Sequence, residues 1–355
     1  MTTVKVYDIV NCGPRHQFAV NSKVVKNSSK GLQLHNMRRD CFKAEDTEEY
    51  KVLMREGKDI TEKSKLSVMD TLARLLRPTI IPAKGHKFVV GDWSAIEARV
   101  LPWLTDSEGG RAALGIFEQG IDVYINTAIS MGLKEEDRQI GKVANLSLGF
   151  GGGVGAFQAM AKNYGLDMPD GQVKSIVNRW RDANQWARKF WNSLEVASVN
   201  AVRNPKQCFE AGRIRYVFIP EILGGTLMCI LPNETIIQYP YAKIEKGTVT
   251  AMKSSVQPKA DSDDEWPRMS LWGGFLAENC TQATAASLLR EVLADLNEDE
   301  FPVVGHVHDE VILEVLDSEV DQYKVWLQEA MELAPEWANG LPLNAAPVVM
   351  NRYGK

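Results

Sequence analysis

The spacing of apolar residues changes several times along the chain, and each change predicts a different element. Residues 66–77 carry apolar side chains at helical spacing and end before a proline, which predicts a helix. The run 87–90 is continuously apolar and stops near Asp92, as a buried strand would. Residues 94–104 return to helical spacing. We therefore expect a strand that ends in a carboxylate and leads into a helix.

The rest of the chain separates into helical and β-rich blocks. The pattern predicts, in order, a mostly helical stretch, a β-rich stretch, a long helix, two short strands and a last helix: residues 109–200, 208–244, 276–296, 303–307, 311–315 and 319–333. The stretch 40–65 is polar and charged, and the tail after residue 333 is irregular. The pattern therefore predicts both helical and β-rich segments.

The first 27 residues have a different pattern from the rest of the chain. They contain three short alternating runs, at 4–10, 17–20 and 23–25, with turn residues between them. We interpret them as a small β-rich segment.

Composition limits the classes of function. The chain has 355 residues, of which 45% are hydrophobic and 25% charged, as in ordinary globular proteins. It shows neither a long apolar span nor a signal peptide, and its five cysteines are scattered. This favours a reducing cytoplasm and argues against a zinc site. The net charge of −5 requires any nucleic-acid site to be a local patch.

Two carboxylates lie at the ends of predicted strands. Asp92 ends the run 87–90, and taken alone it is more simply explained as the N-cap of the next helix. Asp309 lies between His308 and Glu310 at the tip of a predicted hairpin, where an acidic turn is the simple explanation.

Considered together, these carboxylates indicate a metal site. Strands far apart in sequence can pair in one sheet and bring Asp92 beside Asp309. Two carboxylates can hold two metal ions about 3.5–4 Å apart, which clamp the attacking and leaving oxygens of an in-line displacement. Carboxylate oxygens suit Mg²⁺, a hard cation.

A third group of candidate residues recurs at every fourth position. Arg138, Lys142, Leu146 and Phe150 would form one slanting stripe on a helix, because each step drifts only about 40°. Two cations followed by two apolar groups could bind a triphosphate and then its sugar and base. The alternative is an ordinary amphipathic helix with two solvated cations.

These residues carry a resemblance to the family A DNA polymerases, most of all to the phage and prophage branch. Motif A of that family is similar to Asp92–Arg99, motif B to Arg138–Gly151 and motif C to His308–Glu310, in the family's order. Further similarity lies in Ser67–Asp70, Trp272–Gly274, Glu278–Ala283 and Trp337–Leu343. The resemblance covers Ser28–Lys355.

The resemblance implies a role for each matching residue. Asp92 and Asp309 would bind two catalytic Mg²⁺ ions. Arg138 and Lys142 would hold the incoming triphosphate, and Lys142 would also protonate the leaving pyrophosphate. Glu97 would exclude a ribose 2′-OH, and Phe150 would stack near the templating position. Gln282 and His308 would contact the primer–template, and Glu310 would lie near the metals. Gln33 and Asn36 would contact the minor groove.

Three positions depart from the family's pattern. Leu146 stands where Phe or Tyr is usual, Phe150 where Tyr is usual, and Ala95 where Gln is common. The first two put speed and sugar discrimination in doubt, because they line the implied nucleotide site. They leave the reaction type unaffected.

The resemblance implies an α+β fold with the architecture of a right-hand polymerase. A palm of antiparallel sheet and helices would comprise residues 28–108 and 246–355. Mostly helical fingers with a β-rich insertion would comprise residues 109–245. Primer–template DNA and dNTPs would be the partners.

Residues 1–27 resemble the carboxyl-terminal fragment of an intein. In such a fragment Asn27 would cyclise and cut the chain after itself, Ser28 would accept the partner's acyl group, and His16 would transfer protons. Lys26 departs from the pattern, where His is usual. The alternative is a small hairpin appendage with an incidental Asn-Ser. The intein resemblance implies an amino-terminal partner chain that supplies thumb, exonuclease and the matching intein half.

Two other functions stay open. A single-subunit RNA polymerase shares a related palm, although Glu97 and the His-Asp-Glu triplet argue against it. An inactive remnant or DNA-binding accessory is the other alternative, and the intact set Asp92, Asp309, Arg138 and Lys142 argues against it.

Overall fold

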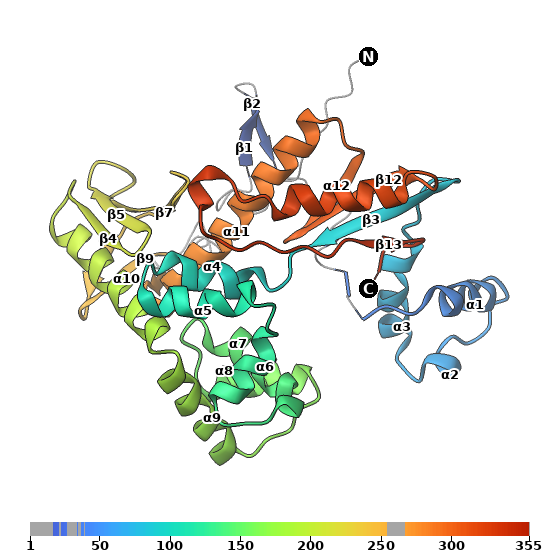
Figure 1. Cartoon of the computed structure of the whole chain (residues 1–355), viewed down its shortest axis with the longest axis horizontal. Helices are drawn as coiled ribbons and strands as arrows, with labels where there is room; N and C mark the ends of the chain where they lie inside the picture. Colours follow the sequence, from blue (N-terminus) through green and yellow to red (C-terminus); the bar gives the residue numbers. More distant parts are fainter. Residues whose placement is uncertain are drawn as a thin grey trace, which may run out of the picture. The chain divides into compact units, whose positions relative to one another are not determined.

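The computed structural model describes residues 17–20, 23–26, 34, 37–38, 40–253 and 267–354, which form two compact units (Figure 1). The first comprises Met1–Ser94, Glu291–Leu333 and Asn344–Lys355, and the second comprises Ala95–Arg290 and Ala334–Leu343. These units are defined by contacts alone. The boundaries proposed for palm and fingers therefore stay predictions.

The first unit is built on a four-stranded antiparallel sheet in the order β11-β12-β3-β13, of which β12, β3 and β13 are labelled in Figure 1. Its strands are β3 His86–Asp92, β11 Val303–Val307, β12 Glu310–Leu316 and β13 Val348–Met350. The strands predicted at 87–90, 303–307 and 311–315 are confirmed. The tail predicted to be irregular instead contributes β13, whose three residues are too few to show a period.

Both faces of β3 are covered, which explains its unbroken apolar run. Phe88 and Val90 belong to a buried cluster on one face that includes Tyr353 from the carboxyl-terminal tail. On the other face, a Cβ added to Gly91 would lie 2.5 Å from the Met331 sulfur of α12 (Val320–Glu332). Alternation along the strand therefore places Asp92 on the face of Phe88 and Val90.

The remaining helices of the first unit precede β3. They are α1 Ala44–Arg55, α2 Thr61–Ser64, α3 Val68–Leu75 and the 3₁₀ helix η2 Arg77–Thr79. The predicted helix at 66–77 is confirmed in its central part, and Ser67 caps it by accepting from the Asp70 N–H at 3.1 Å. The polar stretch 40–65 contains α1, which buries little more than Tyr50 and therefore lacks a clear apolar period.

The amino-terminal strands predicted at 17–20 and 23–25 are confirmed as the antiparallel pair β1 Gln17–Val20 and β2 Lys23–Lys26. The run 4–10 lies outside the described residues.

The second unit combines helices with two small antiparallel sheets. Its helices are α4 Ile96–Leu104, α5 Glu108–Glu118, α6 Val123–Ser130, η3 Glu135–Asp137, α7 Arg138–Leu148, α8 Val154–Asn163, α9 Asp170–Ala183, α10 Gln185–Arg203, η4 Glu336–Ala338 and most of α11 Gly273–Glu298. One sheet has the order β4-β5-β6-β7 and the other β10-β9-β8. Their strands are β4 Cys208–Ala211, β5 Ile214–Ile219, β6 Thr226–Ile230, β7 Ile236–Tyr239, β8 Lys243–Glu245, β9 Thr248–Met252 and β10 Arg268–Ser270. The predicted helical and β-rich blocks and the long helix are confirmed.

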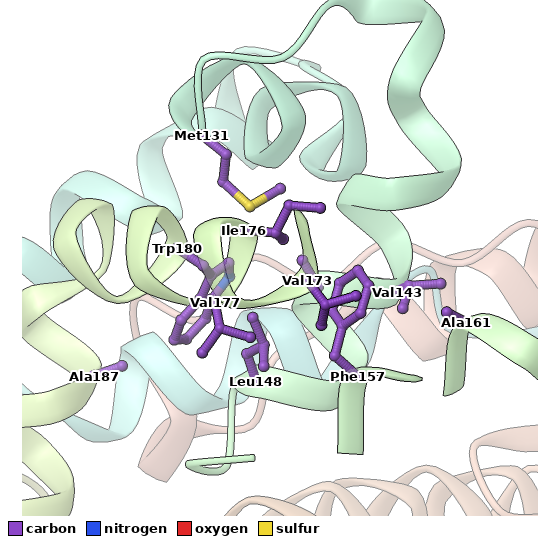
Figure 2. Packing of buried hydrophobic residues seen from close by; sticks show 11 residues of the cluster. Met131, Val143, Leu148, Phe157, Ala161, Val173, Ile176, Val177, Trp180 and Ala187 are labelled. Carbon is purple, nitrogen blue, oxygen red and sulfur yellow. The ribbon is translucent and has the colours of Figure 1, made fainter. Parts of the chain in front are cut away.

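The core that supports α7 is formed by helices α7, α8 and α9. Val143 and Leu148 of α7 point toward Phe157, Val173 and Trp180, and all five side chains are buried (Figure 2). This packing fixes which face of α7 is turned away from the core.

Gly141 sets the distance between α6 and α7. A Cβ at this position would lie 2.0 Å from the carbonyl oxygen of Tyr124 and 3.0 Å from the backbone nitrogen of Ala128. Because backbone atoms cannot rotate away, we expect Gly141→Ala to lower the free energy of unfolding by about 1–3 kcal/mol. Denaturant unfolding followed by circular dichroism measures this change.

Gly115 of α5 is the matched control, since its added Cβ would have only the Gln119 amide nitrogen within reach, at 3.9 Å. Gly115→Ala should leave stability unchanged or raise it by up to about 1 kcal/mol, because alanine favours helix. Equal losses at the two positions would show that the α6–α7 contact is not the cause.

No helix in the described part of the chain combines the length and apolarity needed to cross a membrane.

Candidate active site

Asp92 is the last residue of β3 and is paired directly with Glu310, the first residue of β12. The simple explanation of Asp92 as a helix cap is wrong. The N-cap of α4 is Ala95, in a left-handed conformation with φ 52°, and its side chain makes no cap hydrogen bond. Asp92 therefore belongs to the sheet, and its partly exposed carboxylate lies at the sheet's end.

Asp309 lies at the same end of the same sheet. His308 and Asp309 form the two-residue turn between β11 and β12, and Val307 pairs with Glu310 across it. His308 has φ 54°, as a tight hairpin turn requires at one of its central positions. The backbone N–H of Trp93 donates to the carbonyl oxygen of Asp309 at 3.4 Å. The strand register thus brings the backbones of residues 92 and 309 together.

The donor set fits magnesium. Two carboxylates from neighbouring backbone positions offer oxygen ligands, and Mg²⁺ commonly uses only one or two carboxylates and completes its shell with water and substrate phosphate. Within the described ranges, no group of three or more His, Cys, Asp or Glu side chains forms a metal cage. Two carboxylates alone leave positions in the shell of a bound Mg²⁺ ion for water and for substrate oxygens.

Glu310 lies beside Asp92 with its carboxylate turned into the protein. Its side chain is buried, and its Oε1 accepts a 2.6 Å hydrogen bond from the Tyr353 hydroxyl. Behind it, the buried Arg77 guanidinium packs on the Tyr353 ring at 5.1 Å. Neither Arg77 nor Tyr353 stands out in the sequence, since one is in a short 3₁₀ helix and the other in the tail.

The stripe on α7 is partly confirmed. Arg138, Lys142 and Leu146 lie on the face that the core leaves exposed or partly exposed, opposite the buried Ala144. Phe150 does not continue the stripe as a helical residue, because α7 ends at Leu148 and Phe150 lies in the following turn.

Both cations of the stripe have partners in the second unit. Asp122 caps α6 with Oδ1, and its Oδ2 accepts from Arg138 Nε at 2.9 Å. Burial opposes ionisation of Asp122, but hydrogen bonds from the Ile125 N–H and from Arg138 outweigh it and lower the carboxyl pKa.

Aromatic rings border the same two cations. Lys142 Nζ lies 5.7 Å from the ring centre of Tyr124 and 5.2 Å from that of Tyr164, and Arg138 lies 5.1 Å from Tyr124. Such cation–π contacts orient the cations without neutralising them. Asp122, Tyr124 and Tyr164 were not selected from the sequence, where only the helix-capping position of Asp122 could be recognised.

Glu97 of α4 and Gln282 of α11 meet within the second unit. Gln282 Nε2 lies 3.5 Å from Glu97 Oε1, at the long limit of a hydrogen bond. Burial raises the pKa of the Glu97 carboxyl, and the charge of Glu278 raises it further, against the bond from Gln282. Two residues that the resemblance assigned to sugar selection and DNA contact are therefore neighbours.

The other predicted site residues are either exposed or outside the described part of the chain. His308 is exposed at the hairpin turn. Gln33 and Asn36, and the proposed splicing residues His16, Asn27 and Ser28, lie outside the described residues.

Comparison with known proteins gives a curated relative and solved structures of similar fold. The chain is 31% identical over 351 residues to the DNA polymerase of Bacillus phage SP02. That match covers 96% of this chain and 52% of the phage protein, so the chain spans about half the length of this curated relative. No protein-family profile matches the sequence.

The structure resembles the POL domain of Pol1 from M. smegmatis, solved in complex with a DNA primer-template and dNTP. The TM-score is 0.51, with 14% identity, over 79% of this chain and 42% of that one. At this identity the likeness concerns the fold, and it confirms the prediction of an α+β polymerase-type fold.

Proposed function

We propose that this chain is the catalytic part of a template-directed DNA polymerase that adds dNTPs to a primer 3′ end. One observation carries the proposal: the register of β3 with β12 brings Asp92 and Asp309 to one end of one sheet. The similarity to a phage DNA polymerase, in the same chain, supports this reaction over others that use paired carboxylates.

In this proposal two carboxylates hold the metal ions and two cations bind the nucleotide. Asp92 and Asp309 would hold two Mg²⁺ ions, and these ions would stabilise negative charge on the attacking and leaving oxygens. Arg138 binds the triphosphate, and a phosphate oxygen replaces Asp122 as the partner of its guanidinium. Lys142 neutralises the triphosphate and donates a proton to the leaving pyrophosphate.

The test is primer extension by the full chain on a template of defined sequence with Mg²⁺. We expect products that follow the template with dNTPs and far less product with rNTPs. Efficient synthesis with rNTPs would favour the RNA polymerase alternative. DNA binding without synthesis, with or without an amino-terminal partner, would favour the accessory alternative.

Glu97 provides a prediction on sugar selection. If its side chain occupies the space of a ribose 2′-OH, Glu97→Ala should improve use of rNTPs relative to dNTPs by roughly 10–200-fold, the range for one steric group in a pocket. Single-nucleotide incorporation kinetics with matched dNTP and rNTP measure the ratio. Glu118→Ala, at an exposed position near the end of α5, is the control and should leave the ratio unchanged.

The raised pKa of Glu97 gives a second readout for this residue. A carboxyl whose folded pKa lies above its unfolded pKa stabilises the fold at low pH and loses that contribution as pH rises through the folded value. Glu97→Gln, which cannot ionise, should therefore gain stability relative to the native chain as pH rises. A difference that is constant with pH would contradict this assignment.

Splicing is the finer part of the proposal. We propose that Asn27 and Ser28 join the chain to an amino-terminal polymerase half. The match to the phage polymerase leaves only about 4% of the chain, roughly 14 residues, uncovered. It therefore extends into the 27 residues that splicing would remove, which weighs against this part. Mixing with a candidate partner and finding no loss of those residues by mass spectrometry would reject it.

A further inference from the structure

We infer that Tyr353 and Arg77 are positioning residues for the carboxylate site: they hold Glu310 and thereby fix the turn that carries Asp309. This inference rests on the proposed function, since it concerns how the metal-binding carboxylates are kept in place.

Glu310 connects the turn to the sheet. It follows Asp309 directly, begins β12 and is paired with Asp92. A cross-strand pair presents its side chains on one face, so Asp92 and Glu310 would be two like charges side by side. The 2.6 Å bond from the Tyr353 hydroxyl directs Glu310 into the buried interior instead.

Tyr353 is itself held from several directions. Its N–H donates to the carbonyl oxygen of Ile80 at 2.9 Å, and β13, just before it, pairs with β3. Its ring lies in the buried cluster beneath Phe88 and Val90. The hydroxyl therefore has a fixed position, which a donor must have to orient a carboxylate.

Arg77 completes the support. Only 5% exposed, it donates from NH2 to the carbonyl oxygen of Leu34 at 3.0 Å. Its NH1 lies 3.5 Å from the Tyr353 hydroxyl oxygen, and its guanidinium packs on the Tyr353 ring. The positive charge of Arg77 is thus placed behind the buried carboxylate of Glu310, with the tyrosine between them. This arrangement compensates a charge that would otherwise be costly to bury.

The three residues come from distant parts of the sequence and meet directly under the hairpin. These three residues would affect metal binding only indirectly, through the orientation of the carboxylates that bind the metal. Loss of groups that orient metal ligands typically weakens metal binding about 10–100-fold. Since Glu310 is a neighbour of both carboxylates, we expect the lower end of that range.

The test compares Mn²⁺ binding by the full chain, measured by electron paramagnetic resonance, among four variants. Tyr353→Phe keeps the ring and removes the hydroxyl, and it should weaken Mn²⁺ binding about tenfold. Glu310→Gln keeps an oxygen acceptor for Tyr353 and should weaken Mn²⁺ binding less than Tyr353→Phe does. Tyr50→Phe, at an equally buried tyrosine of another cluster in the first unit, should have no effect. Asp309→Asn should lose most of the binding.

The outcomes separate the inference from the proposed function. Native binding by Tyr353→Phe, with loss in Asp309→Asn, would overturn the positioning role and leave the metal assignment intact. A loss in Glu310→Gln as large as in Asp309→Asn would make Glu310 a ligand and also overturn the inference. Native binding by Asp309→Asn would reject the metal assignment itself, and the inference with it.

A second measurement does not depend on the metal. Amide hydrogen exchange of residues 305–312 should be faster in Tyr353→Phe than in the native chain and unchanged in Tyr50→Phe. If exchange of the hairpin does not respond to loss of the Tyr353 hydroxyl, the support is absent.

Discussion

Asp309→Ala is expected to reduce DNA synthesis by on the order of 10³-fold or more while the chain stays folded. A carboxylate that holds a catalytic metal ion contributes several kcal/mol of charge stabilisation in the transition state, and each 1.36 kcal/mol is a factor of ten in rate. Asp309 lies in a turn and is only partly buried, so its removal leaves no cavity in the core. Primer extension measures the rate, and thermal unfolding checks the fold.

The chain offers a matched control at the other end of β12. Asp317 is an exposed aspartate that directly follows the strand, whereas Asp309 directly precedes it. Asp317→Ala should retain native activity. Comparable losses from the two substitutions would mean that general damage to the hairpin, rather than loss of a metal ligand, explains the effect.

Lys142→Met is expected to lower the rate of dNTP incorporation by about 10²–10⁴-fold, the usual contribution of a general acid. Methionine has a similar reach but neither charge nor proton. Lys142 is partly exposed on α7, and its Nζ approaches the rings of Tyr124 and Tyr164. Stability should change by no more than about 1 kcal/mol, the value of exposed cation–π contacts.

Two further variants separate charge from proton transfer. Lys142→Arg keeps the positive charge but holds its proton too firmly to be an efficient acid. It should therefore retain dNTP affinity and still be slow. Lys174→Ala, at an exposed lysine of α9, should resemble the native chain. Native kcat in Lys142→Met would remove Lys142 from the reaction.

Helices and strands with a clear pattern of apolar residues could be predicted from the sequence. The strand β3, the hairpin β11–β12, and the helices α7, α11 and α12 bury continuous or evenly spaced apolar residues, so their types were evident. The helix α1 and the strand β13 were missed, because one is largely polar and the other has three residues. The helix α1 depends on the packing of its Tyr50 with Ile60 and Leu75, and β13 depends on its pairing with β3.

The same distinction applies to the site. Asp92 and Asp309 could be identified because each ends or interrupts an apolar run, and the register of β12 on β3 then brings them together. Tyr353, Arg77 and Asp122 could not, because their roles arise from hydrogen bonds between residues far apart in sequence. The prediction that Phe150 lies on the same helix as Arg138 was wrong, because the helix ends two residues earlier, at Leu148.

Asp92 and Asp309 must share metal ions if the chain catalyses a polymerase reaction as proposed. The most direct test is anomalous diffraction from crystals of the chain grown with primer–template, a non-hydrolysable dNTP analogue and Mn²⁺. We predict Mn²⁺ peaks in contact with both carboxylates and with the triphosphate. Mn²⁺ bound elsewhere, with these two side chains directed to separate surfaces, would contradict the proposed mechanism.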